Sequence, residues 1–257
     1  MFDDDDSVGW PDMLQSGWHD TERGELAPGF PVVPDELILD IGCGDFGFFE
    51  RFCAERGARL ILADIDGDKL KALAEKLAEF GPDRVRTLKT DADPIPLSDA
   101  CVDKVIAAEV LEHVADPERF VAELARVARP GALFLVTVPG ALSEHLQQEL
   151  APPSYFKPPN HIRIFQPGEL AALLRRHGLE VVCESSRGFY NSMWWMLFWA
   201  SKQDFAPPWH PVLRAWNSCW ARLLETEEGP KIKRILDDFL PKSVAVVARK
   251  PLAATQS

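Results

Sequence analysis

A regular alternation of short apolar runs and helical patterns between residues 36 and 138 constrains the fold more than any other feature of the sequence. The runs are mostly continuous in apolar residues, as strands covered on both faces are, and the segments between them show i, i+3, i+4 apolar spacing. This succession predicts an α/β fold with a doubly wound parallel sheet. The expected strands are residues 36–41, 59–64, 84–90, 102–108 and 132–138, and the expected helices are 46–56, 68–80 and 117–128.

The pattern continues less regularly to the end of the chain. A proline-rich loop at residues 152–159 precedes an expected helix at 167–177 and a strand at 179–186, and a last strand is expected at 243–250. We interpret the chain as a single domain with an N-terminal cap segment (1–35), a core (36–187 and 243–250) and a helical insert (188–242).

Charge and cysteine content narrow the partners and the compartment. The chain has 28 Lys and Arg against 40 Asp and Glu, a net charge of −12 that would repel a nucleic-acid backbone. Five cysteines without a C-x-x-C pair make no closed disulfide framework, so we expect a reducing cytoplasm. The acidic N-terminus lacks a secretory signal, and the longest apolar run, residues 193–200, is too short for a membrane span.

A glycine-rich turn follows the first expected strand. The sequence ILDIGCGDFG places Gly42, Gly44 and Gly47 where bare backbone can approach a ligand and helix N-terminal amides face it. Asp64 ends the second strand, 22 residues after Gly42, which suits a carboxylate that binds ribose hydroxyls. The pattern predicts a nucleoside-type cofactor, and it fits a nicotinamide dinucleotide as well as S-adenosylmethionine.

The remaining motifs distinguish these two cofactors. The strings LDIGCG, LADID, TDADPIPLSDACVDKV and EVLEHVADPERFVAELARVARPGALFLVTVP resemble class I S-adenosylmethionine-dependent methyltransferases, with a weaker similarity in NHIRIFQPGELAALLRRHGLEVV. The resemblance implies a Rossmann-like seven-stranded sheet with a reversed final hairpin. It also implies methyl transfer to a small-molecule acceptor, with oxygen as the expected atom. A non-catalytic S-adenosylmethionine-binding protein and an NAD-dependent oxidoreductase are the alternatives.

The resemblance also assigns cofactor-binding residues, at Asp40, Gly42, Gly44, Asp64, Ile65, Asp91, Ala92 and Glu109. In that assignment Asp64 binds the ribose hydroxyls and Ile65 packs on the adenine. Asp64 and Asp91 can also be read as ordinary turn residues, because aspartate is common there for backbone reasons. Phe46 stands where the family often has glycine, and the third glycine comes one place later, at Gly47, so we expect a slightly wider loop.

Glu109, Glu112 and His113 have helical i, i+3, i+4 spacing after the fourth strand, and His161 follows on a loop that reaches the same sheet edge. These four residues predict a site for Mg²⁺, Mn²⁺ or Zn²⁺. The set looks like that of the methyltransferases of small RNA 3′ ends and of ubiquinone-pathway O-methylation. The alternative has no metal, with His113 or His161 as the catalytic base. His19 and Tyr155 are weaker candidates.

The insert holds six of the eight tryptophans: Trp194, Trp195, Trp199, Trp209, Trp216 and Trp220. It reads as two helical pieces broken by Pro207 and Pro208. A hydrophobic subcore, a lid or acceptor pocket, a homodimer contact and shallow membrane contact all fit this composition. The insert shows no basic amphipathic face, which disfavours the membrane.

Overall fold

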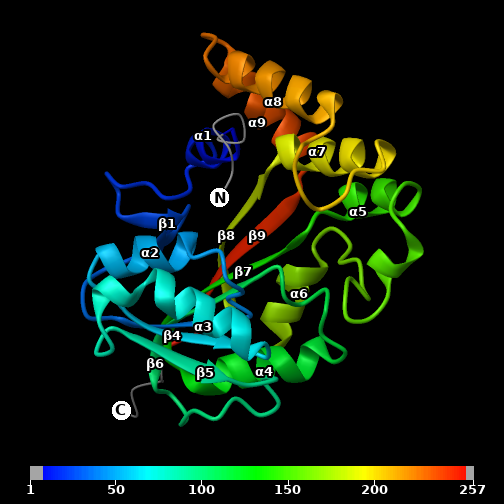
Figure 1. The fold of residues 1–257 in the computed structure, drawn as a ribbon. Coiled ribbons are helices and arrows are strands. Elements are labelled where there is room, and N and C mark those ends of the chain that lie inside the picture. The colour runs from blue at the N-terminus through cyan, green and yellow to red at the C-terminus, as the bar shows by residue number, and fades with distance from the viewer. Residues whose placement is uncertain (1–7, 253–257) are drawn as a thin grey trace.

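The computed structural model describes residues 8–252 and has a central sheet with helices on both faces (Figure 1). The sheet order is β5-β4-β3-β6-β7-β9-β8, and β9 alone runs opposite to the rest. This confirms the predicted seven-stranded sheet with a reversed final hairpin. The strands are β3 (Leu37–Ile41), β4 (Arg59–Asp64), β5 (Val85–Lys89), β6 (Val102–Ala108), β7 (Ala128–Pro139), β8 (Glu180–Arg187) and β9 (Ser243–Arg249).

Alternate side chains of the central strands point into two separate cores. On β3, Leu39 and Ile41 pack with α4 (Pro117–Val127) and α6 (Glu169–Arg176), whereas Ile38 faces the other side. That second core is covered by α2 (Phe48–Glu55), α3 (Gly67–Lys76) and the hairpin of β1 (Glu25–Ala27) and β2 (Phe30–Pro31). The apolar runs therefore form strands because both of their faces are covered.

Helix boundaries follow local capping chemistry. The carboxylate of Asp116 accepts a 3.0 Å hydrogen bond from the Arg119 amide and so caps α4, as its position before Pro117 predicts. The predicted helix at 46–56 begins later, at Phe48, because Gly47 adopts a left-handed φ of 87°. The helix predicted at 68–80 ends at Lys76, and a 3-10 turn (Ala78–Phe80) follows.

The insert contains three helices where the sequence predicted two: α7 (Phe189–Ala200), α8 (Pro211–Leu224) and α9 (Gly229–Phe239). They gather with α1 (Gly9–Gln15) at one end of the sheet, next to α5 (Ala141–Gln148), and a 3-10 turn (Pro153–Phe156) lies in the proline-rich loop (Figure 1). No helix among residues 8–252 is long and apolar enough to cross a membrane. The division into cap, core and insert stays a prediction.

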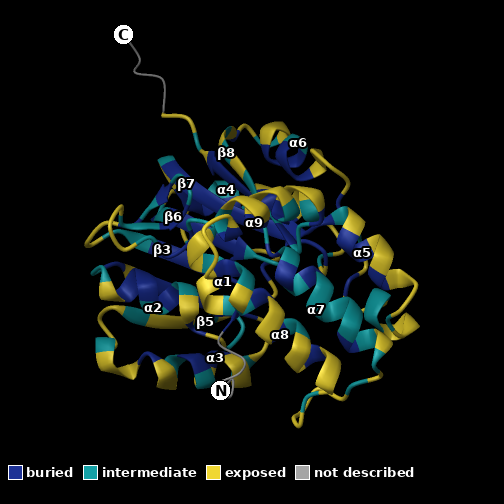
Figure 2. Ribbon diagram, turned by 90° about the horizontal axis from the view of Figure 1, so that it is seen from above, coloured by how far each residue is buried: buried dark blue, intermediate teal, exposed yellow. Residues whose placement is uncertain are grey.

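Helices α5 and α9 escaped prediction because they bury polar side chains. The buried residues of α5 are Ser143, Glu144 and Gln147, and those of α9 are Gly229, Lys233 and Asp237. Apolar periodicity, the main sequence signal for a helix, therefore does not mark their inner faces. By contrast, α7 is apolar all round, yet most of its residues are only half-buried (Figure 2).

Candidate active site

A cavity of about 430 Å³ opens at the carboxyl ends of β3, β4, β5 and β6. This is the edge at which open α/β sheets bind ligands. Five residues predicted to bind the cofactor line the cavity: Gly42, Asp64, Ile65, Asp91 and Ala92. His113 lines it as well, whereas Asp40, Gly44 and Glu109 are not among its lining residues, and their contact with the cofactor stays a prediction.

The glycine turn is folded onto the end of β4. The Gly42 amide donates a 2.7 Å hydrogen bond to the Ala63 carbonyl, and the Gly44 amide donates one of 2.9 Å to Asp64 Oδ2. A Cβ atom on Gly42, whose φ is 69°, would lie only 2.4 Å from Cγ2 of Val110. Glycine is thus required at position 42 both by conformation and by the close approach of the neighbouring loop.

Asp64 sits at the base of the cavity with 9% of its surface exposed. Its Oδ2 accepts from Gly44, and its Oδ1 accepts a 2.8 Å hydrogen bond from the Asp66 amide. A carboxylate has about four lone-pair sites, so each oxygen can still accept a hydroxyl. Ile65 beside it is 68% exposed, which leaves an apolar surface at the mouth of the cavity.

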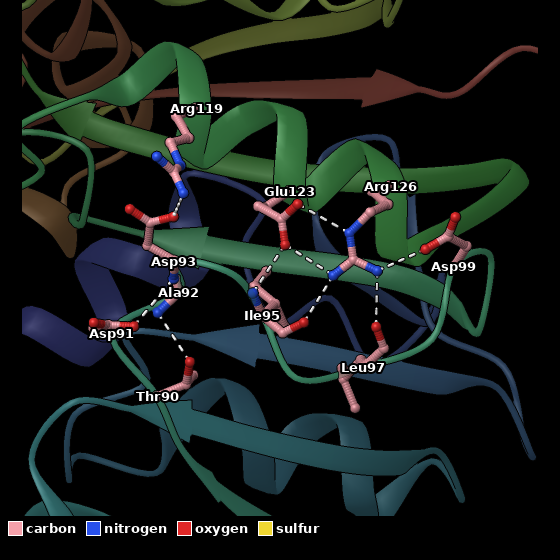
Figure 3. A network of polar contacts seen from close by, with 10 residues as sticks. All are labelled: Thr90, Asp91, Ala92, Asp93, Ile95, Leu97, Asp99, Arg119, Glu123 and Arg126. Atoms are coloured by element: carbon pink, nitrogen blue, oxygen red, sulfur yellow. Dashed lines mark hydrogen bonds and ion pairs between the residues drawn. The ribbon is translucent and has the colours of Figure 1, made fainter.

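The loop after β5 is fixed to helix α4 by an arginine that the sequence analysis did not single out (Figure 3). The guanidinium of Arg126 donates to the carbonyls of Ile95 and Leu97, at 2.7 and 2.8 Å. It also bonds both oxygens of Glu123, which accepts from the Ile95 amide. These contacts fix the segment that follows Asp91 and Ala92, and Ala92 is itself buried against the core.

Asp40 lies beneath the glycine turn, buried against α2, where it shares a hydrogen bond with Glu50. Burial, then the charge and hydrogen bond of Glu50 and the charge of Asp64, raise the pKa of Asp40 well above its usual range. Burial likewise raises the pKa of Glu50, against the hydrogen bonds and the Lys76 charge that lower it. A protonated Asp40 that donates to Glu50 satisfies both buried carboxyl groups.

We therefore expect Asp40→Asn to fold as well as the wild type near neutral pH, because the amide can donate in place of the protonated carboxyl. A carboxyl with a raised folded-state pKa stabilises fully below its unfolded value of 3.8, and that contribution is lost as pH rises through the folded pKa. When pH is raised from 4 upward, the free energy of unfolding in urea should fall less for Asp40→Asn than for the wild type. Asp40→Ala should lose about 1 to 3 kcal/mol. Parallel pH profiles for Asn and wild type would contradict the shared proton.

Glu109 lies apart from the other predicted metal ligands. It follows β6 with a left-handed φ of 55°, so the helical turn that would have placed it beside Glu112 and His113 does not form. Its carboxylate accepts instead from Thr137 Oγ1 at 2.9 Å and from Lys242 Nζ at 3.2 Å. Burial raises the pKa of Glu109, but the charges of Lys242 and Arg187 outweigh it and the pKa is lowered.

Glu112, His113 and His161 do converge, with one ligand-type atom from each lying within 4.8 Å of the others. The rings of His113 and His161 are 4.9 Å apart, which confirms that the loop after the fifth strand reaches this edge. Glu112 is 1% exposed, and neither of its carboxylate oxygens has a hydrogen-bond partner among the described residues. Two unpartnered buried oxygens are costly, so the cluster is suited to a cation or to a donor supplied by a ligand.

The sequence analysis missed Glu144, which orients His161. Glu144 is 1% exposed on α5, and its Oε2 lies 2.5 Å from His161 Nδ1. With the Nδ1 proton directed at Glu144, Nε2 of the neutral ring keeps a free lone pair. His113 is arranged in the same way, because its Nδ1 lies 3.0 Å from the Pro159 carbonyl. The polar residues at helical spacing in α5, Ser143, Glu144 and Gln147, were the sequence signal that could have identified Glu144.

The two weaker candidates are packing residues in this structure. His19 is 3% exposed, contacts the Phe48 carbonyl through Nε2 and packs on Phe49, and burial lowers its pKa to about 4. Tyr155 packs between His161 and Trp199, at centroid distances of 4.6 and 5.2 Å. Burial raises the pKa of the Tyr155 hydroxyl, so its basic phenolate form is hard to reach.

Known proteins share both the sequence and the fold. A family model described as a methyltransferase domain matches residues 39–136. A probable S-adenosylmethionine-dependent methyltransferase of Mycolicibacterium smegmatis is 34% identical over 60% of this chain, and the match covers 55% of that protein. The chain thus spans about half the length of this relative.

A second relative is covered more fully. A ubiquinone biosynthesis O-methyltransferase of Hahella chejuensis is 30% identical over 63% of this chain, and the match covers 70% of that protein. The crystal structure of the cyclase SpnF, 20% identical, superposes with a TM-score of 0.60 over 96% of this chain and 83% of its own, which shows the fold. The sequence matches, together with the glycine turn and the Asp64 cavity, establish that the chain belongs to the class I S-adenosylmethionine-dependent methyltransferase family.

Proposed function

We propose that the protein transfers the methyl group of S-adenosylmethionine to an oxygen atom of a small-molecule acceptor. The observation that carries the proposal is the cavity in which the glycine turn, the buried Asp64 carboxylate and the pinned loop of Asp91 and Ala92 meet. Family membership favours S-adenosylmethionine over the dinucleotide that the glycine motif alone also fits. The O-methyltransferase name of the Hahella chejuensis relative supports an oxygen acceptor.

The residues of the cavity fit this cofactor. Asp64 keeps acceptor capacity on both oxygens for the ribose hydroxyls, and Ile65 and Ala92 offer apolar surface to the adenine. When bound, S-adenosylmethionine supplies a methyl group on a positively charged sulfur.

The acidic character of the chain, net charge −12, keeps nucleic acid out of the acceptor class. Its five free cysteines suit a reducing cytoplasm.

His113 and His161 would take up the proton of the acceptor hydroxyl where no cation occupies their Nε2 atoms. Each ring directs Nδ1 at a fixed acceptor, the Pro159 carbonyl or Glu144, so Nε2 is the basic nitrogen in both. Bound S-adenosylmethionine would supply the methyl group by cleavage of its carbon–sulfur bond as the acceptor oxygen bonds to the methyl carbon, and the hydroxyl proton would pass to one of these nitrogens. The fixed rings supply orientation as well as basicity.

We further propose that Glu112, His113 and His161 hold a divalent cation, without Glu109. The fit rests on the two unpartnered oxygens of Glu112 and on the two imidazoles within 4.8 Å of it. A carboxylate with two imidazoles is a donor set that Zn²⁺ and Mn²⁺ accept. Such an ion would lower the pKa of a bound hydroxyl and fix its direction.

The cofactor assignment is tested by Asp64→Ala. We expect isothermal titration calorimetry to show S-adenosylmethionine binding weakened about 10- to 100-fold, because hydrogen bonds to a charged acceptor contribute about 1.5 to 3 kcal/mol. The matched control is Asp66→Ala, which removes a carboxylate that caps α3 and does not line the cavity. Equal affinities for the two variants, both folded by circular dichroism, would refute the role of Asp64.

A further inference from the structure

A second cavity, of about 680 Å³, lies between α1, the glycine turn and the insert. Trp10 lines it from α1, Phe46 and Phe48 from the turn, Trp194 and Trp195 from α7, and Phe205 from the loop that follows. This volume is within the range of small-molecule sites, about 300 to 1,000 Å³. The cavity is distinct from the one that holds Asp64, since the two share no lining residue.

None of the residues that line the second cavity carries a charge, in a chain with 26% charged residues. Its polar side chains include Asn191 and Tyr190, and the Tyr190 hydroxyl is bonded to Asn217 at 2.7 Å. An anionic or cationic ligand would lose its hydration here without a counter-charge, which is costly. The lining therefore selects an uncharged, apolar ligand.

Aromatic rings at the cavity are left largely in water. Phe46 is 69% exposed, Phe48 46% and Phe205 72%. A ligand that covered these rings would gain about 25 cal/mol of binding free energy for each Å² of apolar surface removed from water. Large rigid rings also lose little conformational entropy on binding. Folded proteins rarely expose a group of aromatic rings to water unless another molecule binds over them.

Side-chain contacts link the second cavity to the groups proposed to act in methyl transfer. Phe46 and Phe48 flank Gly47 in the glycine turn, so one wall belongs to the loop that approaches the methyl donor. On the other side a series of ring contacts leads from Trp195 to Trp199 (5.7 Å), then to Tyr155 (5.2 Å), then to His161 (4.6 Å). The apolar cavity and the polar Glu112 cluster thus lie at two ends of one aromatic wall.

We propose that this second cavity binds the uncharged apolar body of the methyl acceptor, whose hydroxyl reaches His113 and His161. The acceptor is thus an amphipathic molecule with an aromatic or hydrocarbon body and a polar reacting end. The assignment of the ligand as the methyl acceptor rests on the proposed function. The presence of an apolar binding site does not depend on it.

A matched pair of fluorescent probes tests the site. N-phenyl-1-naphthylamine is uncharged, and 8-anilinonaphthalene-1-sulfonate has the same rings with an added sulfonate. We expect the protein to bind one N-phenyl-1-naphthylamine per chain, with an affinity at least about tenfold above that for the sulfonate. The titration is performed on the full chain without S-adenosylmethionine.

Two phenylalanine variants locate the probe. Phe205, in the cavity, is 72% exposed, and Phe239, outside it on α9, is 67% exposed, so neither change should unfold the protein. We expect Phe205→Ala to weaken N-phenyl-1-naphthylamine binding about five- to tenfold and Phe239→Ala to change it less than twofold. Equal effects of the two variants, or equal affinity for the two probes, would overturn the proposal. The proposal would also be overturned if the wild type bound no probe and formed a homodimer that Phe205→Ala dissociates, because a second chain would then cover the cavity.

The acceptor assignment has its own measurement. With methyl-labelled S-adenosylmethionine and an organic-solvent extract of small molecules, saturating N-phenyl-1-naphthylamine should reduce labelled product at least about fivefold and leave calorimetric S-adenosylmethionine affinity unchanged. Undiminished labelling would overturn the assignment of this cavity to the acceptor. If calorimetry without the probe shows no binding of S-adenosylmethionine, the proposed function is contradicted. That result is separate from the test of the acceptor cavity.

Discussion

Replacing Lys233 by methionine is expected to lower the free energy of unfolding by about 3 to 5 kcal/mol, because it leaves two buried carboxylates without their cation. Lys233 on α9 is fully buried, and its Nζ lies 3.0 Å from Asp12 Oδ1 and 2.6 Å from Asp237 Oδ2. Burial raises the pKa of Asp12, and the charge of Lys233 opposes that effect. The ammonium is thus the positive charge that faces both buried carboxylates.

The loss should spread beyond α9, because the same carboxylates hold three other segments. Trp220 Nε1 donates to Asp12 at 2.8 Å, and the Phe189 amide at the start of α7 donates to Asp237 at 2.8 Å. Asp12 itself belongs to α1, which carries Trp10 of the second cavity. We therefore expect Lys233→Met to weaken N-phenyl-1-naphthylamine binding as well as stability.

Urea unfolding followed by tryptophan fluorescence measures the stability loss. Lys231→Met is the matched control, because Lys231 lies on the same helix, is 67% exposed and contacts Glu228 at 3.4 Å, a surface pair that contributes about 0 to 1 kcal/mol. Adding Asp12→Asn and Asp237→Asn to Lys233→Met should restore part of the stability, since the uncompensated charges are then gone. Similar losses for Lys233→Met and Lys231→Met would show that the buried triad contributes little.

The sheet and the cofactor cavity were predictable because their signals are local. Strands β4 and β6 have the predicted bounds, since both are rich in apolar residues that are buried on the two faces of the sheet. The glycine turn and Asp64 are joined by the register of two adjacent parallel strands, so the spacing along the chain already brings them together. A short-range pattern sufficed for each of these features.

The polar interior was not predictable in the same way. Glu109 has helical spacing from Glu112 and His113, yet it turns toward Lys242, which lies 133 residues further along the chain. Lys233 and Asp12 come from opposite ends of the chain and meet only when α1 packs on the insert. Buried polar side chains take whichever partner the tertiary packing provides, and sequence spacing does not encode that choice.

Glu112→Gln is expected to abolish divalent-metal binding and to lower acceptor turnover about 10²- to 10⁴-fold, while S-adenosylmethionine affinity stays within about twofold of wild type. The amide keeps the shape of the side chain but removes the charge that would face the cation, and Glu112 does not line the Asp64 cavity. The matched control is Glu149→Gln, an exposed position just after α5 that is outside the cluster.

Metal binding is best measured separately from turnover, by calorimetric titration of Mn²⁺ into protein dialysed against a chelator. We expect one Mn²⁺ per chain for wild type and Glu149→Gln, and no saturable binding for Glu112→Gln. Glu144→Gln should weaken Mn²⁺ about 10- to 100-fold, because Glu144 fixes the ring of His161 through Nδ1 and a partner of this kind is worth that much to a metal site. Full turnover of the chelated wild type, with no Mn²⁺ bound, would remove the metal from the mechanism and leave His113 and His161 as the bases. In that case the unpartnered oxygens of Glu112 would point to a donor on the acceptor itself, since a buried carboxyl group without a partner is too costly to persist in the working complex.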